Sequence, residues 1–256
     1  MTRRISVPPG FFNGRAAGDE VQLGDEETHY VRAVLRLGEG AVVELFDGLG
    51  HVADALILSP ETGLVALETL EKRDIRESPL EIVLFQAIPK GKRWDWLIEK
   101  VTELGVHTIV PLQTDRTVVK VEGRKATAKL ERWSAIVSGA ARQCGRSRVP
   151  AVSAPATVAE ALRGHPVDVH LAALLTGVRR SAAELLPAER EARRVGLWIG
   201  PEGDFTNGEV QRLLEAGARP LDLGPRILRV DTAAVAAVAL VQAAAGDLTA
   251  VGGRAG

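Results

Sequence analysis

Residues 197–209 read Leu-Trp-Ile-Gly-Pro-Glu-Gly-Asp-Phe-Thr-Asn-Gly-Glu. The first three residues are apolar and typical of a buried strand, and a turn rich in glycine and proline follows them. Thr206 and Glu209 have the spacing of a capping box, which predicts a helix that begins just after Thr206. The stretch therefore predicts a strand, a tight turn and a helix, which is the repeating unit of an α/β domain with a parallel sheet.

The turn in this stretch has two interpretations. Ligands of open α/β sheets bind just beyond the carboxyl ends of the strands, and Gly200 and Gly203 would let a ligand approach the backbone closely. Glu202 would then hold a carboxylate at the mouth of a binding site. An ordinary turn without a ligand has the same spacing, and spacing alone slightly favours that interpretation.

A similar pattern follows at residues 221–234, which read Leu-Asp-Leu-Gly-Pro-Arg-Ile-Leu-Arg-Val-Asp-Thr-Ala-Ala. A strand ends in Gly-Pro, and a helix is expected to begin at Asp231 or Thr232. Between them, Ile227 and Leu228 are able to clamp a flat ring such as adenine, and Arg229 is placed to meet an anionic group. The alternative is a buried loop in which Arg229 pairs with an acidic neighbour.

The rest of the chain predicts two kinds of architecture. The first part carries short strand patterns bounded by turns, with one helical stretch at residues 26–35, which suggests a small β-barrel. From residue 80 onward, apolar strands alternate with amphipathic helices, which indicates a parallel sheet covered on both faces. A charged run ending in proline at residues 72–79 separates the two parts, so we expect domains at 1–74 and 75–256. The strands are expected at 14–21, 38–46, 51–58, 63–70, 80–87, 108–112, 167–175, 194–200 and 220–223, and the later helices at 92–104, 126–144, 206–216 and 231–245.

The composition is that of a globular chain with an uneven charge. Of its 256 residues 46% are hydrophobic and 25% are charged, which is enough to build a core. Residues 1–74 hold 7 Lys and Arg against 13 Asp and Glu, whereas residues 116–148 hold 9 against 2. The absence of a secretory pattern and the single cysteine lead us to expect cytoplasmic residence and neither a disulfide framework nor a metal cofactor.

Two arginine-rich segments are candidate RNA contacts. Residues 140–150 end a helix and carry three arginines and a glutamine, which favours a phosphate clamp over simple complements of the helix dipole; they are Arg142, Gln143, Arg146 and Arg148. Arg32 and Arg36 lie four residues apart in the helical stretch of the barrel, which places them on one helix face. Both would contact a phosphate backbone there, or both would simply be solvated. Cys144 is expected to be a small buried or half-buried thiol rather than a nucleophile, because no histidine lies near it in sequence.

Several common chemistries have no motif here. The chain has no G-x-G-x-x-G dinucleotide fingerprint, no Walker loop, no H-E-x-x-H pair and no G-x-S-x-G elbow. Nicotinamide, kinase and simple hydrolase functions therefore lack local support.

Together the segments closely resemble the RsmE family, the uridine-N3 methyltransferases of 16S ribosomal RNA in the SPOUT superfamily. The matching stretches are HYVRAVLRLGEG, LFDG, RESPL, ARQCGRSRVP, IGPEGDFTNGE and LGPRILRVDTA, which occur in family order. The resemblance implies a PUA-like β-barrel at 1–74, an α/β trefoil-knot methyltransferase domain at 75–256, S-adenosylmethionine (SAM) as cofactor, small-subunit RNA as partner, and a homodimer.

The resemblance also implies roles for individual residues. Arg229 and Glu202 would act around the N3 atom of the uridine, and Arg32, Arg36, Arg142, Gln143, Arg146 and Arg148 would contact RNA. The cofactor would be held by Leu175, Thr176, Ile199, Gly200, Pro201, Glu202, Gly203, Leu223, Gly224, Ile227, Leu228 and Thr232.

Two positions depart from the family pattern. The family commonly has a second glycine where this chain has Asp204, and glutamate where it has Asp231, which is expected to serve as a good helix N-cap. Two other functions stay open at this point. One is a SPOUT methyltransferase acting on another ribosomal or transfer RNA nucleotide, and the other is a non-catalytic RNA-binding assembly factor.

Overall fold

The chain folds into two compact units in the computed structural model. One contains Met1–Glu77 and Ser138–Val149, and the other contains Ser78–Val137 and Pro150–Gly256. The expected boundary after residue 74 falls outside the described residues. The structure describes residues 3–72, 76–90, 93–117, 121, 124–186 and 193–248, apart from the side chains of 72, 124 and 125.

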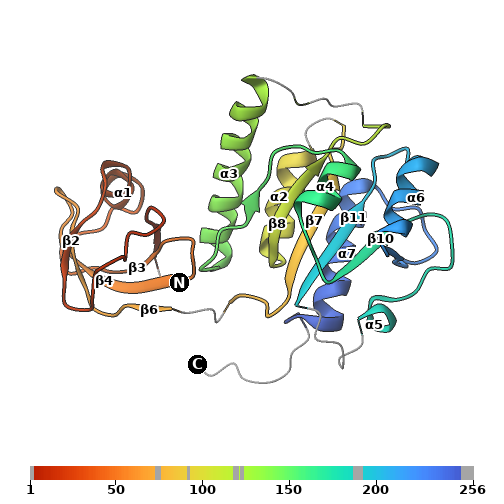
Figure 1. Cartoon of the computed structure of the whole chain (residues 1–256). Helices are drawn as coiled ribbons and strands as arrows, with labels where there is room; N and C mark the ends of the chain where they lie inside the picture. Colours follow the sequence, from red (N-terminus) through yellow and green to blue (C-terminus); the bar gives the residue numbers. More distant parts are fainter. Residues whose placement is uncertain are drawn as a thin grey trace. The chain divides into compact units, whose positions relative to one another are not determined.

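The first unit is a six-stranded sheet around its own core (Figure 1). The strand order is β1-β3-β4-β5-β2, with β6 paired to β4, and every pair except β1–β3 is antiparallel. Alternate residues of β5 are buried, as expected of a sheet with one face on the core. The strands are β1 (Arg4–Ser6), β2 (Glu20–Gln22), β3 (Val42–Phe46), β4 (His51–Ser59), β5 (Leu64–Leu67) and β6 (Glu71–Lys72).

Several details of this unit differ from the sequence expectation. Strands β1 and β6 were not predicted, and β3 begins at Val42 rather than at residue 38. The strand expected at 14–21 is only β2, because the chain before it forms turns. The expected helix at 26–35 consists of α1 (Asp25–His29) and a π-helical turn, η1 (Tyr30–Val34). The helical stretch ends there, since Arg36 has a φ of 52° and the N–H of Leu37 turns back to the carbonyl of Val31 at 3.1 Å. The placement of Arg32 and Arg36 on one helix face was therefore wrong.

The second unit is a six-stranded sheet in which every pairing is parallel. Its order is β12-β10-β11-β7-β8-β9. The central strands β7 and β11 are almost wholly buried apolar runs, as expected where both faces are covered. The strands are β7 (Glu81–Ala87), β8 (Val106–Leu112), β9 (Ala151–Val152), β10 (Val169–Ala173), β11 (Arg194–Ile199) and β12 (Arg219–Pro220).

Helices flank the parallel sheet (Figure 1). Helix α7 packs against α2, β7 and β11, whereas α4 packs against α6 and β8. The apolar cluster around Phe85 and Trp198 includes Val158 of α4 and Leu213 of α6. The helices are α2 (Arg93–Glu103), α3 (Arg124–Cys144), α4 (Val158–Gly164), α5 (Ala182–Leu185), α6 (Asn207–Glu215) and α7 (Val230–Ala245).

Most expected elements of the second unit are confirmed, and their ends differ by up to three residues. The capping box of Thr206 and Glu209 at the start of α6 is also confirmed. The expected start of α7 was wrong, because Arg229 has an extended backbone and is itself the N-cap. Asp231 lies in the first turn, where a carboxylate complements the helix dipole. Across the described residues, no helix has the length and apolar character needed to span a membrane.

Candidate functional site

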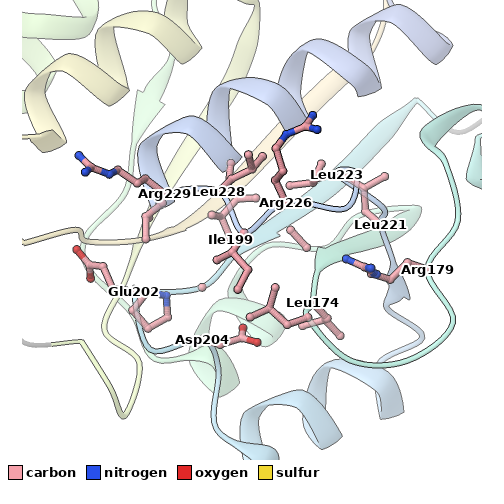
Figure 2. A pocket seen from close by; sticks show the side chains of 18 of the residues that line it. Leu174, Arg179, Ile199, Glu202, Asp204, Leu221, Leu223, Arg226, Leu228 and Arg229 are labelled. Atoms are coloured by element: carbon pink, nitrogen blue, oxygen red, sulfur yellow. The ribbon is translucent and has the colours of Figure 1, made fainter.

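A cavity of about 250 Å³ lies where three neighbouring strands of the parallel sheet end. Because β10 pairs with both β11 and β12 in parallel, their carboxyl ends meet at one edge of the sheet. The loops that follow these strands form the cavity, which is the position at which open α/β sheets bind ligands (Figure 2). Both glycine–proline turns quoted above therefore line a single site.

The walls of the cavity are largely apolar. Leu174, Ile199, Leu223 and Leu228 contribute aliphatic side chains from the three loops (Figure 2). Within the described residues, the backbones of Ile227 and Leu228 make no hydrogen bond to another part of the chain. Polar backbone groups beside aliphatic walls are suited to a flat heterocycle that needs both stacking and hydrogen bonds.

The turn after β11 has a well-defined hydrogen-bond pattern. The N–H of Asp204 donates to the carbonyl of Pro201 at 2.9 Å, and Asp204 has a φ of 60°. Its Oδ1 accepts the N–H of Phe205 at 2.8 Å. The Oε1 of Glu202 accepts the N–H of Lys90, from the loop after β7, at 3.0 Å. The turn is thus closed internally and tied to a neighbouring loop.

The loop after β8 braces the other side of the turn. Asp115 accepts the hydroxyl of Thr206 at 3.1 Å through Oδ2, and its N–H donates to Oε1 of Glu209 at 3.0 Å. The side chain of Glu209 is buried, with the residue 3% exposed, so its bond to Asp115 is partly sheltered from water. The bond between Asp115 and Thr206 is exposed. The capping box of α6 is therefore part of a network that includes the cavity turn and the loop after β8.

Charged groups surround the rim of the cavity. Four arginines and two carboxylates line it, and two of the arginines lie near acidic groups: Arg93 at 3.9 Å from Asp231, and Arg179 at 3.7 Å from Asp222. Among the described residues, Arg226 and Arg229 have no ion-pair partner. The alternative in which Arg229 pairs with an acidic neighbour is thus contradicted, and its guanidinium is available to an anionic or carbonyl group of a ligand.

Beneath the cavity, the aromatic core contains a titratable group. The indole Nε1 of Trp198, one residue before Ile199, donates to Nδ1 of His170 at 3.0 Å, and the Trp198 ring stacks on Phe85. Burial lowers the pKa of His170 below its ordinary value. A neutral imidazole is required to accept the indole N–H, so the neutral form is part of this packing.

Most of the residues predicted to hold a cofactor line the cavity. Three do not: Thr176 lies in the exposed bend after β10, Gly203 turns its carbonyl toward Arg116, and Thr232 is exposed in the first turn of α7. Those that do are Leu175, Ile199, Gly200, Pro201, Glu202, Leu223, Gly224, Ile227 and Leu228, together with Arg229.

Sequence reasoning missed several lining residues. Asp204 and Arg226 stand inside the two quoted loops, but neither was predicted to line the site. Arg93 and Arg179 lie in other segments, and no sequence pattern links them to the turns. The remaining missed residues are apolar: Ala173, Leu174, Leu221, Val230 and Ala233.

The predicted RNA contacts have different surroundings within the first unit. Arg146 is only 4% exposed and forms an ion pair with Glu77 at 2.7 Å, so its guanidinium has a structural role and the phosphate contact is not retained. Arg142 stacks over the Tyr30 ring at 4.9 Å, and the main-chain N–H of Arg148 donates to Glu77 at 2.9 Å. Arg32, Arg36 and Gln143 are exposed.

Cys144 ends α3 as a half-buried residue. Its thiol donates to the carbonyl of Ala141 at 3.6 Å. The expectation of a buried or half-buried thiol is confirmed.

Comparison with known proteins identifies both units. A family model described as an RNA methyltransferase domain matches residues 76–242, and one described as an RNA methyltransferase PUA domain matches residues 18–69. Ribosomal RNA small subunit methyltransferase E of Bacillus subtilis (strain 168) is 32% identical over 84% of this chain and 87% of its own length. The chain belongs to this family.

Solved structures that are similar to this chain agree with this assignment. The enzyme from Neisseria gonorrhoeae bound to S-adenosyl methionine has 32% identity and a TM-score of 0.83, covering 97% of this chain and all of its own. A Legionella pneumophila protein in complex with the bound cofactor SAM has 35% identity and a TM-score of 0.84 over the same shares. The resemblance noted from the sequence is confirmed, as is the fold class of a PUA-like domain followed by a SPOUT methyltransferase domain with a parallel sheet.

Proposed function

We propose that this chain transfers a methyl group from SAM to N3 of a uridine in the RNA of the small ribosomal subunit. The observation that carries the proposal is the meeting of the two glycine–proline loops in one cavity, in a chain of the RsmE family. Relatives in this family are named as small-subunit methyltransferases, and two neighbours were solved with SAM bound.

The residues present suit the proposed cofactor. Aliphatic walls would hold the adenine ring, together with the backbones of Ile227 and Leu228, which make no hydrogen bond within the described residues. When bound, SAM supplies a methyl group on a sulfonium, which is already a strong electrophile. The protein therefore has to orient the uridine and deal with the proton on its N3.

Two side chains at the rim are suited to that task. The guanidinium of Arg229, which has no ion-pair partner among the described residues, would donate hydrogen bonds to a uridine carbonyl, where negative charge develops as N3 loses its proton. Glu202 would accept the proton or orient the base, and it is the weaker candidate because one of its oxygens already accepts the N–H of Lys90. Both roles are a matter of positioning and electrostatics, with no covalent adduct to the protein.

The RNA would be held by exposed and half-buried groups of the first unit. We propose that Arg32, Arg36, Arg142, Gln143 and Arg148 contact it, without Arg146. We also propose that the protein acts as a homodimer in the cytoplasm, where small-subunit RNA is found in bacteria. The mass of the purified protein in solution, measured by light scattering, tests the dimer.

The decisive experiment is methyl transfer followed by identification of the nucleoside. Purified protein is incubated with SAM and either free small-subunit RNA or assembled small subunits that lack the modification, and digests are analysed for 3-methyluridine by mass spectrometry. We expect 3-methyluridine at one position. A methyl group on another base or on transfer RNA would overturn the assignment, and binding of RNA without any transfer would favour an assembly factor.

A further inference from the structure

Asp204 has a positive φ, although it is not a glycine, and it lines the cavity. Among the described residues, only Asp204 and Arg36 have a positive φ without being glycine. A left-handed conformation at a non-glycine residue marks a site where the surroundings impose it. Here the imposed conformation belongs to a residue that lines the cavity.

The side chain of Asp204 presents a carboxylate to the cavity. Figure 2 shows this carboxylate beside Leu174, among the side chains that line the cavity. Its Oδ1 accepts the N–H of Phe205 at 2.8 Å, which holds the group in place. Within the described residues, the other oxygen has no hydrogen-bond partner and the carboxylate has no ion-pair partner. One oxygen is therefore left for a ligand.

The charge of this carboxylate is not matched by the arginines of the same cavity. Arg93 and Arg179 lie near Asp231 and Asp222, and none of the four lining arginines pairs with Asp204. A carboxylate beside aliphatic walls is less screened than one in water, so it favours a cationic ligand group more strongly. SAM has two such groups in its methionyl part, the sulfonium and the ammonium.

We propose that Asp204 selects the donor by charge: its carboxylate attracts a cationic group in the methionyl part of SAM. This inference rests on the proposed function and adds a specificity-determining residue to that site. A glycine at the same position would preserve the turn without the attraction. The preference of the chain for SAM over an uncharged adenosine ligand would thus be larger than that of the same turn with glycine at position 204.

The test compares two ligands that share the adenosine part. SAM has both cationic groups, whereas 5′-methylthioadenosine is a neutral thioether without the amino acid. Asp204→Asn retains an oxygen that accepts the N–H of Phe205, and Asn tolerates a positive φ. Calorimetry should show SAM affinity falling roughly three- to tenfold in this variant, while the affinity for 5′-methylthioadenosine stays within about twofold. Added salt should weaken SAM binding to the wild type more than to the variant.

Two controls separate charge from structure. Asp204→Gly removes the carboxylate from a turn that glycine fits, so it should repeat the ligand-selective loss. Asp168→Asn makes the same charge change near the amino end of β10, where Asp168 accepts main-chain N–H groups of residues 193 and 194 at 2.9 and 2.8 Å, and should leave both affinities unchanged.

Two results would overturn the proposal. A ratio of SAM to 5′-methylthioadenosine affinity that is the same in the wild type and both Asp204 variants would remove the charge role while leaving the proposed function intact. A wild-type protein that binds neither ligand would overturn the proposed function, and the role of Asp204 with it.

Discussion

The Nη1 of Arg116, in the loop after β8, donates a hydrogen bond at 2.5 Å to the carbonyl oxygen of Gly203, in the turn after β11. The bond joins loops of two different strands, separated in the sheet by β7. Because the turn between Gly200 and Asp204 lines the cavity, Arg116 is a positioning residue for the ligand site.

Replacing Arg116 should loosen the turn and weaken donor binding. A charge-assisted hydrogen bond at an exposed site contributes about 1 kcal/mol, so Arg116→Ala should raise the KM for SAM on the order of fivefold with a smaller change in kcat. Steady-state kinetics measures both constants. Arg132→Ala is the matched control, since Arg132 pairs with Asp95 on an exposed surface of the same unit. An unchanged KM for SAM in Arg116→Ala would show that the hydrogen bond from Arg116 to Gly203 does not position the turn for donor binding.

Replacing Arg229 should lower kcat for methyl transfer and leave the affinity for SAM almost unchanged. Removing a hydrogen-bond donor aimed at developing charge costs on the order of a hundredfold in kcat, so Arg229→Ala should lose about that much while SAM affinity changes little. Arg226→Ala is the control, since Arg226 also lines the cavity and has no ion-pair partner within the residues that the structure describes. This variant should lose less than about tenfold in kcat. Methyl transfer at the wild-type rate by Arg229→Ala, with SAM bound, would remove the catalytic role.

The buried pair of Arg146 and Glu77 predicts a stability effect. Removing one partner leaves an uncompensated charge, so Arg146→Met should lower the free energy of unfolding by about 3–5 kcal/mol. Arg142→Met loses a half-buried stacking contact with Tyr30 and should cost about 1 kcal/mol. Urea denaturation followed by tryptophan fluorescence or circular dichroism measures both. Equal small losses would mean that the ion pair contributes little.

The exposed arginines of the first unit predict a change in the salt dependence of RNA binding. Each contact to a phosphate contributes close to one unit to the slope of log K against log salt. The double variant Arg32→Ala with Arg36→Ala should therefore reduce the slope by about two units without changing the unfolding midpoint. Arg163→Ala, an exposed arginine of α4 in the other unit, is the control. An unaltered slope in the double variant would place the RNA elsewhere.

Acid should destabilise the second unit through His170. Burial lowers its pKa below the ordinary value of 6.5, so the unfolded chain takes up a proton at a higher pH than the folded protein does. The free energy of unfolding should thus fall as the pH drops below about 6.5, until the folded form also titrates.

The variant His170→Asn offers an acceptor to Trp198 without titrating, and should show a smaller loss between pH 7.5 and 5. Some dependence should remain, since burial and the nearby Arg194 also lower the pKa of His165. Urea denaturation at both pH values checks this, and identical pH profiles for variant and wild type would exclude His170 as the cause.

Much of the local structure was predictable because it depends on neighbours in the chain. The capping box of Thr206 and Glu209 is a contact across three residues, and the buried strands β7 and β11 are continuous apolar runs. The beginning of α7 was predicted less well. Asp231 is a better N-cap than arginine by its side chain, but the path of the chain from β12 gives Arg229 the extended backbone that an N-cap requires.

The sequence by itself determined the alternation of strands and helices, the two glycine–proline turns and, through its motifs, the family. Only the tertiary structure decided that both turns line one cavity and that Arg116 and Asp204 belong to the site. It also decided that Arg146 is buried against Glu77, whereas Arg229 pairs with no acidic group in the described part of the chain. The physical reason is that helices, caps and turns are stabilised by residues a few positions apart, whereas a cavity and its ion pairs depend on the order and direction in which distant strands pair.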